Sequence, residues 1–151
     1  MTLVVAMFKI FVGLLLAITL AFIVYFVSTA LVISVLRPST LNGVLVTVFT
    51  VGLGAGVGAF IGWFEGGRGI LTLLAIFAAT MVFAFAGSYV GIMQGIERAP
   101  FQPSWQYGLP VLSFTVGGGV IGANLLPLTL WLYDTARNSN MWLRRAGVTR
   151  R

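Results

Sequence analysis

The sequence predicts an all-α integral membrane protein, a four-transmembrane-helix bundle with glycine-rich packing faces. Three observations predict this fold class. Of the 151 residues 59% are hydrophobic and only 8% are charged, whereas a soluble domain has about 25% charged residues. Four long stretches carry no charge, and many of the 19 glycines gather on faces of these stretches. The composition excludes a soluble fold, a disordered chain and a nucleic-acid-binding module.

The first two predicted spans cover residues 10–36 and 41–64. A helix needs roughly 20 consecutive apolar residues to cross the hydrocarbon core. Lys9 and Arg37 bound the first stretch, and Glu65 ends the second. Both stretches are therefore long enough to span a bilayer.

The third and fourth predicted spans cover residues 69–96 and 110–132. Arg68 and Glu97 bound the third stretch, and Asp134 follows the fourth. The third is longer than the hydrocarbon thickness requires, so we expect it to tilt or to continue into the headgroup region.

The four spans form one membrane domain over residues 1–133, and a basic tail follows over residues 134–151. Four spans put both termini and the connection between spans two and three on one side. Seven basic residues fall on that side: Lys9, Arg68, Arg137, Arg144, Arg145, Arg150 and Arg151. Only Arg37 and Arg98 fall on the other side. The positive-inside rule therefore predicts termini in the cytoplasm or its organellar equivalent. We expect the membrane to be a bacterial cytoplasmic membrane.

Aromatic and basic residues outside the spans predict surfaces for lipid or partners. Trp142 precedes Arg144 and Arg145 in the tail, a pattern that suits anionic lipids better than nucleic acid. Trp105 and Tyr107 lie in the proline-rich connection before the fourth span. That connection is expected to lie along the headgroups or to contact a partner.

Small residues recur on one side of each of the last three spans. Glycines four residues apart let helix backbones approach closely in lipid. The predicted packing positions are Gly52, Gly54, Gly56, Gly58, Gly62, Gly87, Gly91, Gly95, Gly118 and Gly122. Tight packing within the bundle, contact with another subunit and a glycine-lined path for a solute all remain open. The face of the second span is wide enough for two neighbours, one of which could belong to another chain.

The fourth span is the best candidate for a kinked or interrupted helix. Gly117 and Gly119 belong to a run of three glycines, each of which costs of order 1 kcal/mol of helix stability relative to alanine. Asn124 and Pro127 follow, and such breaks mark binding sites in some transporters. We expect the Asn124 amide to find a partner on another helix.

The sequence offers few groups for catalysis. It has no histidine or cysteine, and its three acidic residues lie at predicted span ends. The polar groups at depth, Thr50, Thr80, Ser88 and Gln94, are expected to bond to nearby backbone or to another helix. No base lies near a hydroxyl, so we predict no enzyme and no metal site. No cofactor is predicted, although lipid, quinone or pigment could bind without histidine ligation.

These observations favour a non-catalytic small integral subunit of a larger membrane complex, with other membrane subunits as partners. The alternative is a homo-oligomeric channel or carrier for a small or uncharged solute. An enzyme acting on lipid is the least favoured, because the acid and base pairs are missing.

Overall fold

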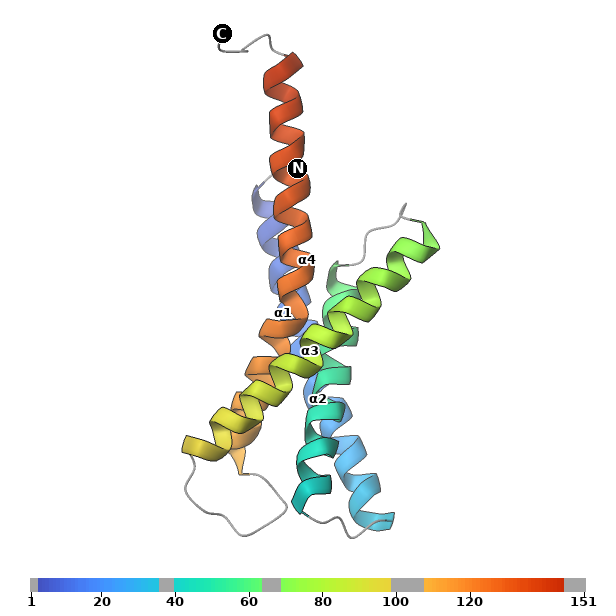
Figure 1. Cartoon of the computed structure of the whole chain (residues 1–151), viewed down its shortest axis with the longest axis vertical. Coiled ribbons are helices and arrows are strands. Elements are labelled where there is room, and N and C mark those ends of the chain that lie inside the picture. Colours follow the sequence, from blue (N-terminus) through green and yellow to red (C-terminus); the bar gives the residue numbers. More distant parts are fainter. Residues whose placement is uncertain (1–2, 36–39, 64–68, 99–107, 146–151) are drawn as a thin grey trace.

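The computed structural model describes residues 3–35, 40–63, 69–98 and 108–145. These residues form four α-helices and, within the described ranges, no strand (Figure 1): α1 (Leu3–Val35), α2 (Thr40–Trp63), α3 (Ile70–Arg98) and α4 (Leu109–Arg145). All four contain segments long and apolar enough to cross a membrane. The prediction of an all-helical chain with four such helices is confirmed.

Two helices extend beyond their predicted spans. The first begins at Leu3 rather than at residue 10, and the fourth continues to Arg145 rather than ending near residue 132. The predicted limits were set by charged residues, which mark membrane depth and not the end of a helix. No glycine or proline occurs between Tyr133 and Arg145 to end α4.

The fourth helix is continuous through its three adjacent glycines and past Pro127. Of the two alternatives that the sequence offered for this span, a kinked or an interrupted helix, the interruption does not occur. An interior proline removes one backbone donor and crowds the carbonyl four residues earlier, which bends a helix without necessarily ending it. Gly108 stands before the helix, where its carbonyl accepts a hydrogen bond from the Leu112 N–H at 3.2 Å.

The helices form two antiparallel pairs, α1 with α2 and α3 with α4, which cross near their middles (Figure 1). Beyond the crossing, α3 turns away while α4 continues beside the first part of α1 (Figure 1). The first part of α1 and the last part of α4 lie toward the same end of the molecule (Figure 1).

Small side chains fill the core where the pairs meet. Among the described residues, six buried alanines belong to one core cluster with Val51: Ala17, Ala21, Ala55, Ala59, Ala84 and Ala123. The largest fully buried side chains are only Ile92 and Val51. The helices are therefore held at short separations, with few large side chains between them.

Candidate functional site

The contact between α1 and α2 is closed by three glycines of α2. A Cβ built on Gly58 would lie 2.6 Å from the Ala17 Cα, and one on Gly54 would lie 2.6 Å from the Ala21 Cα. A Cβ on Gly62 would meet the backbone of Gly13. No larger residue fits at these positions without separating the two backbones.

The remaining predicted glycines of α2 turn toward α3. Gly52 lies against Phe85, and a Cβ on Gly56 would lie 2.6 Å from the Met81 sulfur. Glycines of α2 thus lie against two neighbouring helices. Both neighbours, α1 and α3, belong to this chain.

Glycines from both partners bring α3 and α4 together. A Cβ on Gly87 would meet the Gly118 carbonyl, and a Cβ on Gly118 would meet the Gly87 carbonyl. Gly91 and Gly122 likewise lie against the backbone of the opposite helix. Gly95 lies against Val111: a Cβ built on Gly95 would lie 2.9 Å from the Val111 Cα.

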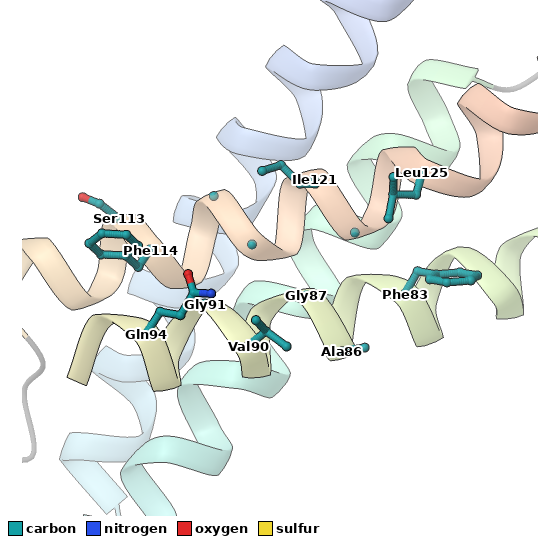
Figure 2. Close-up of a pocket in the computed structure, with 13 residues that line it drawn as sticks. Phe83, Ala86, Gly87, Val90, Gly91, Gln94, Ser113, Phe114, Ile121 and Leu125 are labelled. Atoms are coloured by element: carbon teal, nitrogen blue, oxygen red, sulfur yellow. The ribbon is translucent and has the colours of Figure 1, made fainter. Parts of the chain in front are cut away.

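This close approach leaves a groove of about 640 Å³ along one side of the helix pair (Figure 2). Glycines of both helices form its floor, and larger apolar side chains form its walls. Its lining comprises Phe83, Ala86, Gly87, Val90, Gly91, Gln94, Ser113, Phe114, Gly117, Gly118, Ile121, Gly122 and Leu125. Figure 2 shows Phe83 and Leu125 at one end and Gln94, Ser113 and Phe114 at the other.

A cation marks the second end of the groove. The guanidinium carbon of Arg98 lies 4.9 Å from the centre of the Phe114 ring, a cation–π contact. The Ser113 hydroxyl donates to the Leu109 carbonyl in its own helix at 2.7 Å. Arg98 and Gln94 are both exposed.

The two outer glycines of the run in α4 have different surroundings. Gly117 opens onto the groove, with nothing within 4 Å of a built Cβ. Gly119 instead faces the Ser88 hydroxyl of α3. Ser88 is fully buried, and its Oγ atom has no hydrogen-bond partner. The expectation that this hydroxyl would bond to backbone or another helix is wrong, because it points into the contact with Gly119.

Asn124 joins α4 to α2 by a hydrogen bond, next to Gly13 of α1. Its Oδ1 atom accepts a hydrogen bond from the Trp63 Nε1 of α2 at 2.7 Å, and its Nδ2 donates to the Val120 carbonyl at 2.8 Å. A Cβ on Gly13 of α1 would lie 2.9 Å from the Trp63 Nε1. The sequence placed Trp63 only at a span end. The one sequence signal that could have indicated this contact is Gly13, which is the sole glycine of α1.

The other buried hydroxyls bond within their own helices. Thr50 and Thr80 each donate at 2.8 Å to the carbonyl four residues earlier, as expected. Thr47 and Thr115 do the same. Among the described residues, no three histidines, cysteines or acidic residues cluster as a metal site would require.

The remaining predicted surface residues are not described in detail. Trp105 and Tyr107 lie outside the described residues. Trp142, Arg144 and Arg145 belong to the last part of α4, but their side chains also lie outside the description.

Comparison with known protein families, curated proteins and solved structures finds no match to the chain. The fold defines a four-helix protein whose helices could cross a membrane, which suggests an integral membrane protein.

Proposed function

We propose that the chain is a non-catalytic small integral subunit of a larger membrane complex. Its four helices span a bacterial cytoplasmic membrane with both termini in the cytoplasm. Its partners are other membrane subunits, which cover its outer apolar faces. The observation that carries this proposal is the unequal burial of its helices.

In α2, 50% of the residues in an apolar 18-residue segment are buried inside the chain. In the corresponding segment of α3 only 11% are buried. Large side chains stand exposed along α3, among them Leu71, Val82 and Tyr89. A lipid-facing helix is apolar too, but α3 offers a whole apolar face at which a second protein can pack.

The closed helix contacts favour a packing role over a solute path. Gly58 lies against the backbone of α1, and Gly118 against that of α3, at distances that admit no further atom. Buried hydroxyls such as Thr50 and Thr115 bond to their own helices, so they do not present donors to a solute. The glycine faces are proposed to act in helix packing.

In this proposed arrangement, the C-terminal tail and the connection before α4 supply the contacts at the membrane surface. The basic tail with Trp142, Arg144 and Arg145 would lie on anionic lipid, and the connection with Trp105 and Tyr107 would contact lipid headgroups or a partner. No chemistry is assigned to these residues.

Purification of the tagged full-length chain in a mild detergent tests the proposed role. We expect other membrane chains at fixed stoichiometry, measured by native mass spectrometry. The Gly58→Leu variant should lose them because it separates α1 from α2, whereas Val57→Leu on the same helix should keep them. A discrete homo-oligomer that gives solute flux in liposomes would contradict the proposal and support the channel or carrier alternative.

The proposed orientation has a separate test, because the chain contains no cysteine of its own. Ser139→Cys in the tail and Ser104→Cys in the connection before α4 each introduce a single thiol. A membrane-impermeant maleimide applied to intact cells should label only the second variant. Labelling of the tail cysteine alone would reverse the orientation.

A further inference from the structure

The groove between α3 and α4 has the shape and polarity of a site for a lipid chain. Its volume of about 640 Å³ lies within the roughly 300–1,000 Å³ range of ligand sites. Because glycine has no side chain, the floor of the groove consists of helix backbone. Its apolar walls include Phe83, Ile121 and Leu125. A straight apolar ligand would lie parallel to the two helices (Figure 2).

The length of the groove matches one leaflet of a bilayer. Its lining on α4 runs from Ser113 to Leu125, which corresponds to about 18 Å at about 1.5 Å per residue. Half of a hydrocarbon core of about 30 Å is about 15 Å. A partner helix that crossed the bilayer would need a contact of the full thickness, but Phe83 and Leu125 end the groove.

The charge at one end identifies the class of ligand. Arg98 ends α3 and contacts the ring of Phe114, which lines the groove. Gln94 lies one helical turn before Arg98 and brings an exposed amide to the same end. An exposed guanidinium suits a phosphate, and an amide one turn deeper suits the ester groups that follow it in a phospholipid.

We infer that this groove binds an anionic phospholipid, with one acyl chain along its glycine floor and the headgroup phosphate at Arg98. The site lies in the leaflet at which α3 ends. It does not depend on the proposed subunit role, because every residue that forms it belongs to this chain.

Native mass spectrometry of the purified full-length chain tests this inference. The delipidated protein in detergent is supplied with phosphatidylglycerol and phosphatidylcholine at equal concentrations. We expect one retained lipid, with phosphatidylglycerol preferred. Arg98→Gln should lower that preference about fivefold, the effect of removing one basic residue near a headgroup.

Neighbouring substitutions supply matched controls. Glu97→Gln removes a negative charge beside Arg98 and should not weaken the preference for phosphatidylglycerol. Gly117→Leu should abolish retention of both lipids, because its side chain fills open space in the groove. Retention by Gly117→Leu equal to that of the unsubstituted chain, or an equal loss of preference in Glu97→Gln and Arg98→Gln, would overturn the inference.

A labelling measurement keeps the inference testable if Gly117→Leu does not fold. A single cysteine at Gly117 should react with N-ethylmaleimide in detergent, and phosphatidylglycerol should slow the reaction at least fivefold. A cysteine at Val82, which is 65% exposed and outside the groove, should react at an unchanged rate. Equal slowing at both positions would overturn the inference, as would a dimer that protects Gly117→Cys without added lipid.

Discussion

The two helix pairs use glycine in different ways. In the α1–α2 pair the contact glycines Gly54 and Gly58 stand on α2 and meet the alanines Ala21 and Ala17 of α1, so small side chains fill the contact. In the α3–α4 pair, glycines of both helices meet, and no side chain fills the space between the flanking walls. Glycines of both helices meet in the α1–α2 pair only at Gly62 and Gly13, near the end of α2, whereas in the α3–α4 pair they meet along the contact and a groove lies beside them.

The largest expected effect tests the α3–α4 contact. Gly118→Leu should lower the free energy of unfolding by about 3 kcal/mol, because its side chain must separate two backbones. Gly117→Leu, one residue away, should change it by less than about 0.5 kcal/mol, since it enters open space. Unfolding by sodium dodecyl sulfate, followed by circular dichroism, measures both. Equal losses would show that the groove is not open.

A smaller effect is expected in the α1–α2 pair. Gly58→Ala should cost about 2 kcal/mol, because the new Cβ meets the backbone of Leu16 and Ala17. Gly56→Ala meets the flexible Met81 side chain instead, so we expect a change under about 0.5 kcal/mol. The same unfolding measurement applies, and a costlier Gly56→Ala would reverse the assignment of the two faces.

The third prediction concerns the hydrogen bond that joins the pairs. A double-mutant cycle of Trp63→Phe and Asn124→Leu should give a coupling energy of about 1 kcal/mol, within the range for hydrogen bonds between membrane helices. The cycle is measured from the unfolding free energies of the four proteins. A coupling energy near zero would mean that Trp63 and Asn124 act independently.

The smallest expected effect has the opposite sign. Ser88→Ala should raise the unfolding free energy by about 0.5 kcal/mol, since it removes a buried hydroxyl without a partner. Thr80→Val provides the control, because the Thr80 hydroxyl does bond to the Ile76 carbonyl and its removal should not stabilise the chain. A loss of stability in Ser88→Ala would indicate a partner for this hydroxyl.

The number and approximate positions of the four helices could be predicted from the sequence, because each helix contains one long apolar stretch. α2 begins and ends within one residue of the predicted 41–64. In α4 the apolar segment that could cross a membrane ends at Tyr133, close to the predicted limit near residue 132. The helix itself continues to Arg145, because the charge at Asp134 does not stop a helix.

The groove could not be predicted. The spacing of Gly118 and Gly122 placed these two glycines among the packing positions, but the open space beside them depends on how α3 and α4 rotate about their own axes. The bond of Trp63 to Asn124 depends in the same way on three-dimensional placement.

Cysteine scanning along α4 tests most directly whether an open groove lies beside the closed α3–α4 contact. Single cysteines are introduced in lipid-free detergent at the open positions Gly117, Ile121 and Leu125, and at the buried positions Val116 and Val120. We expect rapid maleimide labelling at the first three positions and slow labelling at the other two. Equal labelling rates at all five positions would contradict an open groove beside a closed contact.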